Sequence, residues 1–278
     1  MFFVIGLNIF VATLVGWAFS VSQNSHTVKS EFPKISDVLT PSKLGFTDPT
    51  LESTYNIHPA VATDHWMSWS LLDRKSGVVI GSDNSSKPSY MMSTIKPWIA
   101  ADYLNSHPSP SDSVLAQLST MIVDSNDQVA YQYFGGQASL DRMAKTCGLT
   151  DVVERSWSWS LTEVSARDAV RLGECIYGGK ATTAAWTAWI VDKMRHVQGL
   201  GDFGPRELFI ERTQVATKNG WYDWEGKWYI NCLSITDGWV ISTIQQWPYT
   251  GGPLSVGIAQ ADPVCDSVAI QVLKLSIE

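Results

Sequence analysis

The chain has 278 residues, of which 45% are hydrophobic and 17% charged, a composition typical of a globular protein rather than a disordered one. Its 20 basic and 27 acidic residues give a formal net charge of −7 at pH 7, and no basic run occurs, so nucleic-acid binding has no electrostatic support. A chain of this length buries a sizeable core in one large domain or two small ones.

The amino-terminal segment has the character of a targeting sequence. Residues 2–19 carry no charge, and the first charged side chain is Lys29. Ala18-Phe19-Ser20 supplies a small-x-small cleavage site, so we expect residues 1–22 to be a signal peptide that is removed on export. An uncharged run of this length also approaches that of a membrane span, and a retained anchor is the alternative. We expect a secreted or cell-envelope protein that touches the membrane only through residues 2–19, if these are uncleaved.

The next two regions differ in composition. Residues 23–60 are rich in Ser, Thr, Pro and Asn, and we expect them to form a spacer before a globular domain at residues 61–278. The domain opens with a partly alternating run at 66–72, a turn at 73–77 and a second strand from Val78, which together predict a β-hairpin.

A helix over residues 90–104 follows, and Pro97 limits where it begins. Proline costs about 3 kcal/mol inside a helix but is tolerated in the first turn, so the helix should start near Ser93. The Ser93 hydroxyl then lies at the positive end of the helix dipole. Ser93-Thr94-Ile95-Lys96 also places Ser93 and Lys96 on one helix face. A neutral lysine can take the proton of a serine nucleophile in this geometry, and we expect Ser93 Oγ within hydrogen-bond reach of Lys96 Nζ.

The remaining elements predict an α+β fold. The hairpin and a C-terminal meander must form one antiparallel sheet across a helical insert, because they are far apart in the sequence. Helical periodicity predicts helices at 111–133, 140–147, 165–177 and 182–197; β-rich runs follow at 213–218, 228–235 and 238–246, and a terminal helix at 263–275.

Four cysteines, Cys147, Cys175, Cys232 and Cys265, show no C-x-x-C spacing. An even number in an exported chain indicates disulfides, and four cysteines allow three pairings. We expect sequence neighbours to pair, Cys147 with Cys175 and Cys232 with Cys265. Free buried thiols are the alternative.

Two further polar motifs follow the Ser93/Lys96 pair. Ser125-Asn126-Asp127 interrupts a helical stretch, and consecutive Ser, Asn and Asp weaken helices, which favours side chains that face a polar cavity. Lys218-Asn219-Gly220 closes the first strand of the meander, where the glycine permits close approach to the backbone. A solvated loop, a hairpin turn or an exposed helix face would explain each motif separately.

In this order the three motifs resemble those of the penicillin-recognising serine hydrolases, which include class A β-lactamases and D-alanyl-D-alanine peptidases. That family carries S-x-x-K on a helix, S-x-N between helices and K-T-G on a strand. The resemblance extends over roughly residues 60–278. It implies a β-lactamase/transpeptidase-like fold, with an antiparallel sheet flanked by helices and a helical insert between the hairpin and the C-terminal meander.

The resemblance also implies roles for individual residues. Ser93 is similar to the acylated nucleophile and Lys96 to the lysine that activates it. Ser125 resembles the hydroxyl that relays a proton to the leaving nitrogen, and Lys218 the cation that attracts the substrate carboxylate and polarises Ser125. The N–H groups of Ser93 and Tyr222 are the expected oxyanion hole. The expected substrate-binding residues are Asn126, Asp127, Asn219, Gly220 and Tyr222.

The chain departs from the family pattern at several points. Asp127 stands where the family has asparagine, and an ionised aspartate accepts hydrogen bonds but donates none. Asn219 replaces threonine, a milder change because the side chain stays polar. Only 32 positions separate Ser93 from Ser125, a shorter insert than class A β-lactamases have.

The glutamate that activates the deacylating water in class A β-lactamases has no clear counterpart. Glu154 and Glu163 lie in the corresponding region, but neither belongs to an E-x-x-L-N run, and surface or capping roles are expected for both. An acyl-enzyme formed from a β-lactam should therefore be long-lived. This favours a peptidase or penicillin-binding protein over an efficient β-lactamase.

The resulting hypothesis is an exported serine hydrolase that is acylated on Ser93 by D-alanyl peptides of the cell wall or by β-lactams, and that deacylates slowly. Its expected partner is a small-molecule or peptide substrate, with no nucleic acid. The histidines show no metal-ligand spacing, so neither a metal nor another cofactor is expected. The alternatives are a catalytically impaired relative that binds wall peptide or an envelope partner, and an esterase on the same scaffold.

Overall fold

This computed structural model describes residues 61–275. They contain a six-stranded antiparallel sheet. The expected signal peptide at 1–22 and spacer at 23–60 lie outside them. The strand order is β2-β1-β8-β7-β5, and β6 also pairs with β7. The strands are β1 Trp66–Asp73, β2 Val79–Gly81, β5 Ala216–Thr217, β6 Gly220–Trp224, β7 Lys227–Ile235 and β8 Trp239–Pro248.

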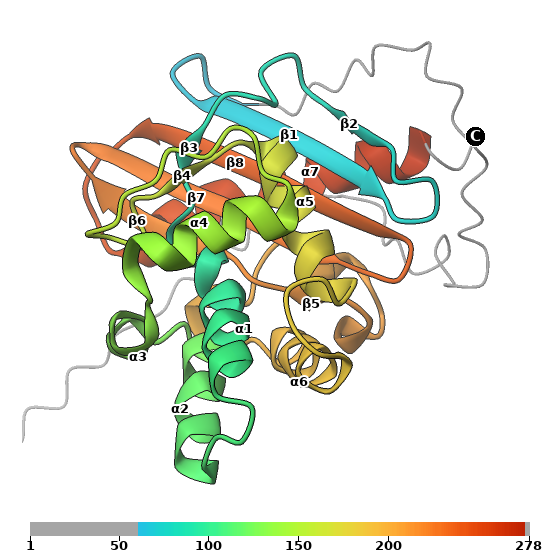
Figure 1. Cartoon of the computed structure of the whole chain (residues 1–278). Helices are drawn as coiled ribbons and strands as arrows, with labels where there is room; N and C mark the ends of the chain where they lie inside the picture. The colour runs from blue at the N-terminus through green and yellow to red at the C-terminus, as the bar shows by residue number, and fades with distance from the viewer. Residues whose placement is uncertain (1–60, 276–278) are drawn as a thin grey trace, which may run out of the picture. The chain divides into compact units, whose positions relative to one another are not determined.

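Strands β1 and β8 join the two ends of the domain (Figure 1). They pair antiparallel from Trp66 opposite Gln246 to Asp73 opposite Trp239. The predicted hairpin and meander thus form one sheet across a helical insert, and the predicted fold class is confirmed.

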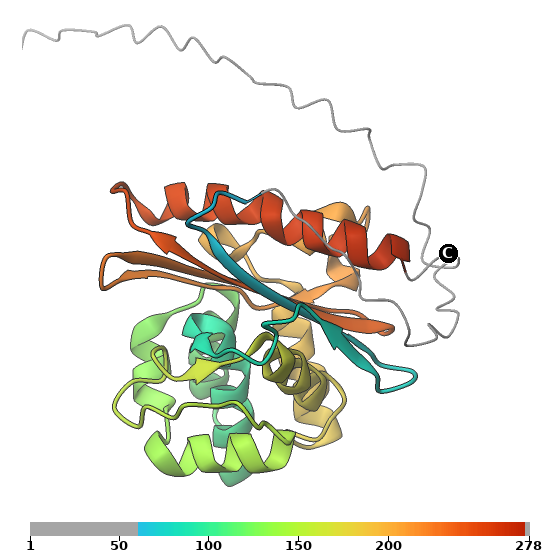
Figure 2. The same ribbon diagram turned by 90° about the horizontal axis from the view of Figure 1, so that it is seen from above.

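Helices cover both faces of the sheet (Figure 2). Helix α7, Leu254–Leu275, lies along one face, and α5, Ala166–Tyr177, packs on the other beside the insert. The other insert helices are α1 Lys96–Ser106, α2 Asp112–Val123, α3 Asp127–Tyr133, α4 Gly136–Cys147 and α6 Ala184–Arg195. Residues on alternate strand positions separate accordingly: Leu233 and Val240 belong to the insert-side core, and Trp228 and Ile230 to the α7-side core.

Helix α7 starts nine residues before the predicted position, since it begins at Leu254 and Pro263 lies inside it. Its apolar side chains pack on the sheet, with Ala261 and Val268 fully buried, and this burial offsets the cost of about 3 kcal/mol for an internal proline. Within residues 61–275, no helix has the length and apolar character needed to cross a membrane.

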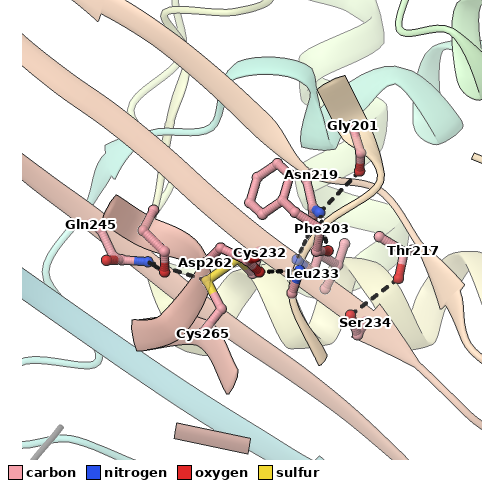
Figure 3. Close-up of a disulfide and its surroundings, with 12 residues drawn as sticks. Gly201, Phe203, Thr217, Asn219, Cys232, Leu233, Ser234, Gln245, Asp262 and Cys265 are labelled. Carbon is pink, nitrogen blue, oxygen red and sulfur yellow. Dashed lines mark hydrogen bonds between the residues drawn. A yellow bond between two sulfur atoms is a disulfide. The ribbon is translucent and has the colours of Figure 1, made fainter. Parts of the chain in front are cut away.

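Two disulfides tie these layers together. Cys147 at the end of α4 pairs with Cys175 in α5, and Cys232 in β7 pairs with Cys265 in α7. Both predicted pairings are confirmed. Figure 3 shows the second disulfide beside Leu233, where it fixes β7 against α7.

Candidate active site

Ser93 lies in a tight turn at the start of the insert. A 3₁₀ helix, Met92–Ile95, runs directly into α1, and Pro97 falls in the first turn of α1, as predicted. Met92 has a φ of +50°, a left-handed conformation that is costly for a residue other than glycine. Hydrogen bonds from Met91 N to Thr162 O and from Met92 N to Ser160 O, both 2.9 Å, hold this backbone in place.

Lys96 is completely buried and donates to three oxygens. Its Nζ lies 2.5 Å from Ser125 O, 3.0 Å from Ser125 Oγ and 2.5 Å from Asp127 Oδ1. These contacts account for all three protons of an ammonium group. Among the described residues Ser93 Oγ has no hydrogen-bond partner, so the expected bond to Lys96 Nζ is not formed: the ammonium is turned toward Ser125 and Asp127 instead.

The surroundings of Lys96 lower its pKa. Burial lowers the pKa of Lys96 to about 8, although the charge of Asp127 and its hydrogen bond oppose the shift. The ring of Trp159 covers the ammonium at 4.8 Å and is itself buried. The lowered pKa makes the neutral form of Lys96 more accessible near neutral pH than that of an exposed lysine.

Ser125 stands at the junction of α2 and α3. Its φ of +58° breaks the helical path at the polar interruption that the sequence indicated, and its side chain contacts the two lysines. Asn126 caps α3, since its Oδ1 accepts from Val129 N at 3.1 Å. This hydrogen bond fixes the start of α3, and the side chains of both Asn126 and Asp127 are exposed.

Lys218 reaches the same serine from the sheet. Its Nζ lies 3.0 Å from Ser125 Oγ and 3.1 Å from Asn219 O, and its side chain is completely buried. Burial, and then the charge of Lys96, lower the pKa of Lys218 well below its usual range. Lys96, Ser125 and Lys218, far apart in the sequence, therefore form one hydrogen-bonded chain with Ser125 Oγ at its centre.

Gly220 joins this chain to the nucleophile turn. A Cβ at this position would lie 2.8 Å from both Ser93 N and Met92 Cβ, and 2.9 Å from Met91 O. Only glycine allows the start of β6 to approach the backbone this closely. The glycine of the third motif is thus explained by contact with Ser93.

The backbone donor beyond Gly220 is identified by the strand register. Lys218 N donates to Leu233 O, and Gly220 and Tyr222 lie opposite Asn231 and Tyr229 in the same register. Hydrogen-bonded and non-hydrogen-bonded pairs alternate in antiparallel strands, so the N–H of Tyr222 points toward β7 and that of Trp221 points away from it. The expected oxyanion donor is corrected from Tyr222 to Trp221.

Asn219 has a framework role, which corrects its prediction as a substrate-binding residue. Its Nδ2 donates to Gly201 O at 3.1 Å and Phe203 O at 2.7 Å, and its Oδ1 accepts from Leu233 N at 3.2 Å (Figure 3). Between β5 and β6, the amide oxygen thus replaces a ladder bond to β7, and the amide nitrogen anchors a neighbouring loop. It is fully buried on the α7 side of the sheet, so it presents no polar atom to a substrate.

Neither glutamate of the 148–167 region contacts Ser93 or Lys96. Glu154 accepts a hydrogen bond from Gln137, and Glu163 pairs with Arg155 at 2.7 Å. Trp159 from the same region covers Lys96 instead, a role that no local pattern in the sequence indicates. Among residues 61–275, no three His, Cys, Asp or Glu side chains are grouped so as to hold a metal ion.

Comparisons with known proteins agree with this geometry at the level of the fold. No protein-family model matches the chain, and no curated protein shows significant similarity. Among solved structures, a β-lactamase from Streptosporangium roseum has a TM-score of 0.61 and 15% identity, covering 77% of this chain and 94% of its own. The reconstructed last common ancestor of class A β-lactamases of Gram-negative bacteria has a TM-score of 0.56 and 14% identity, covering 76% and 95%. The L2 structure complexed with relebactam has a TM-score of 0.57 and 14% identity, covering 76% and 91%. The chain therefore has the β-lactamase fold.

Proposed function

We propose that this chain is a serine hydrolase of the β-lactamase fold that is acylated on Ser93. The observation that carries the proposal is the chain Lys96–Ser125–Lys218, with Nζ–Oγ distances of 3.0 Å on both sides, beside a serine turn that Gly220 contacts. A buried hydroxyl that accepts hydrogen bonds from two lysine side chains is suited to pass protons between them.

The proposed acylation requires the neutral form of Lys96. Its Nζ accepts the proton of Ser93 Oγ, which attacks the substrate carbonyl and forms a carbon–oxygen bond. The N–H groups of Ser93 and Trp221 are the proposed donors to the resulting oxyanion. When the carbon–nitrogen bond breaks, the leaving nitrogen takes its proton from Ser125, and Lys96 passes the proton that it took from Ser93 back to Ser125. Water later releases the acyl group.

The proposed substrates are D-alanyl peptides or the β-lactams that mimic them. Two of the similar proteins are described as a β-lactamase bound to 5(6)-nitrobenzotriazole and as L2 complexed with relebactam, which supports a small-molecule substrate. The contacts of Glu154 and Glu163 leave no carboxylate of that region beside Ser93. We therefore propose slow deacylation.

Export is part of the same proposal. It is supported by the uncharged segment at 2–19 and by the two disulfides, which persist in oxidising compartments. Fractionation of expressing cells, with amino-terminal sequencing of the mature protein, would test export and cleavage. Recovery of the uncleaved chain in the cytosol would contradict both.

Labelling with a fluorescent penicillin tests the catalytic proposal. We expect a covalent adduct that Ser93→Ala abolishes and that decays slowly. Ser89→Ala is a matched control, because Ser89 is also buried near the turn and its Oγ has no partner among the described residues. Loss of labelling in both variants would not support acylation at Ser93, and rapid turnover would contradict slow deacylation.

A non-catalytic relative that binds wall peptide is the second candidate. It is favoured by one observation: Lys96 Nζ donates its three hydrogen bonds to Ser125 and Asp127 and none to Ser93. If the folded protein forms no adduct at any penicillin concentration but binds a stem peptide in calorimetry, this candidate replaces the first.

A further inference from the structure

Asp127 presents a negative charge to solvent at the centre of the proposed site. Its side chain is 64% exposed, while its partner Lys96 is completely buried. Only Oδ1 is occupied, by Lys96 Nζ at 2.5 Å, and Oδ2 has no hydrogen bond to any described residue. The exposed oxygen is an acceptor whose natural partner is a donor or a cation.

An acceptor at this position changes which substrates fit. An asparagine can donate a hydrogen bond to the carbonyl of an acylated substrate amine, whereas an ionised aspartate repels that carbonyl and attracts the hydrogens of a free amine. Asp127 begins α3, and its free oxygen Oδ2 offers an acceptor and no donor to a ligand.

An aromatic surface lies next to this carboxylate. Tyr131 is four residues after Asp127 on α3, which places both side chains on the same helix face. Tyr131 is 59% exposed and packs edge-on against Trp159 at 5.4 Å, and Trp159 in turn covers Lys96. Asp127 and Trp159 thus both contact the buried Lys96, and Tyr131 extends this aromatic surface toward solvent.

We propose that Asp127 recognises a protonated amine on the acyl portion of the substrate, so that the preferred substrates are aminoacyl amides or esters with a free amino group. Tyr131 receives the apolar or aromatic side chain of that aminoacyl group. This inference rests on the proposed acylation of Ser93 and names the substrate class of the same site.

The same contact would prepare Lys96 for its role as a base. Asp127 is the charged group that raises the pKa of Lys96, against the larger effect of burial. A substrate ammonium on Oδ2 competes for the charge of Asp127 and adds a positive charge nearby. Both effects lower the pKa of Lys96 and favour its neutral amine, which is free to turn toward Ser93.

Paired substrates test the inference. Phenylalanine p-nitroanilide and its N-acetyl derivative, each in D and L form, share the reacting amide and side chain; the acetyl group removes the charge and two donors of the amine and adds a carbonyl. At pH 6.5 we expect kcat/KM of the free-amine form to exceed that of the N-acetyl form by at least about tenfold in the better enantiomer, as for a hydrogen bond to a charged group. Asp127→Asn should remove or reverse this preference, and Asp124→Asn, an exposed acid that accepts from Gln198, should retain it.

The outcomes separate the two proposals. If the N-acetyl form is the better substrate of the wild type, or if Asp127→Asn keeps the preference for the free amine, recognition by Asp127 is overturned while penicillin labelling of Ser93 can still stand. If neither the anilides nor penicillin forms a Ser93 adduct, the proposed function itself fails.

Discussion

Lys96 and Asp127 form an ion pair of 2.5 Å in which the cation is sealed inside the protein and the anion faces solvent. The lysine cannot exchange its partner for water, whereas the carboxylate can be hydrated, screened or bound by a ligand. Asp127 is therefore positioned to set the protonation of Lys96 from outside.

Asp127→Asn should shift the pH dependence of acylation. The carboxylate raises the pKa of Lys96, and burial, the larger effect, lowers it to about 8. Removal of the charge leaves burial less opposed, so the pKa falls and the neutral base is present at lower pH. With benzylpenicillin, which has no free amine, acylation below pH 8 should rise about two- to fivefold, because such a pair contributes up to about 1 kcal/mol. Stopped-flow acylation rates between pH 5 and 10 would show this, and a midpoint at higher pH would contradict it.

Gly220→Ala should slow the acylation of Ser93 in molecules that are still folded. The new Cβ would lie 2.8 Å from Ser93 N, a backbone atom that cannot move aside without displacing the nucleophile. A displacement of about 1 Å costs roughly 100-fold in rate. We expect a loss of that size in the rate of penicillin labelling.

Gly226→Ala provides the control for this substitution. A Cβ there would meet no atom within 4 Å, but φ is +75°, so this variant should lose stability and keep its labelling rate per folded molecule. Equal labelling by Gly220→Ala and the wild type would refute the close-approach argument.

Local patterns were sufficient to predict much of the fold. Pro97 placed the helix start near Ser93, and the alternation at 66–72 indicated β1, because both depend on neighbouring residues alone. The disulfide pairs joined sequence neighbours, as expected.

Elements that depend on tertiary partners were missed. Strand β6, Gly220–Trp224, has no clear alternation and is formed by pairing with β7 through a turn at Glu225 and Gly226, both with positive φ. Helix α7 passes through Pro263 because packing on the sheet outweighs local propensity.

Within the site, the sequence indicated which residues gather but not which atoms face one another. Ser125 and Lys218 lie where the motifs predicted, linked through Ser125 Oγ. The choice of Trp221 over Tyr222 depends on the register with β7, and the inward turn of Asn219 depends on the carbonyls of a distant loop. Neither partner can be read from the strand itself.

Asn219→Ala should affect stability far more than chemistry. It leaves Gly201 O, Phe203 O and Leu233 N without their partner, which should cost about 2–4 kcal/mol in the free energy of unfolding. The rate of penicillin labelling per folded molecule should stay within about threefold, because the side chain faces away from the site. Urea denaturation and labelling kinetics measure the two effects.

Asn126→Ala, which removes only the cap of α3, is the comparison variant and should cost about 1 kcal/mol in the free energy of unfolding. A large loss of labelling in Asn219→Ala without loss of stability would restore Asn219 as a substrate-binding residue.

Asp266 should make the domain less stable as the pH rises from about 4 to about 7. Burial raises the pKa of Asp266 from 3.8 to about 7, with further contributions from Asp262 and Glu207. Between these values the folded state holds a proton that the unfolded state has lost, so stability falls with increasing pH, by at most about 4 kcal/mol. Asp266→Asn keeps the size of the side chain and removes the ionisation, so its gain in the free energy of unfolding relative to the wild type should be larger at pH 8 than at pH 5.

Asp192→Asn provides a control whose effect on stability should not differ between pH 5 and pH 8. The pKa of Asp192 is lowered, first by a hydrogen bond from Lys193, so its charge is favoured in the folded state. This variant should lose a little stability, and by the same amount at pH 5 and pH 8, because both values lie above the lowered pKa; the loss disappears only at a more acidic pH, where the wild-type carboxylate is protonated. Urea titrations at both pH values compare the three proteins. If Asp266→Asn changes stability equally at pH 5 and pH 8, Asp266 is ionised over the whole range, and its burial does not control its charge.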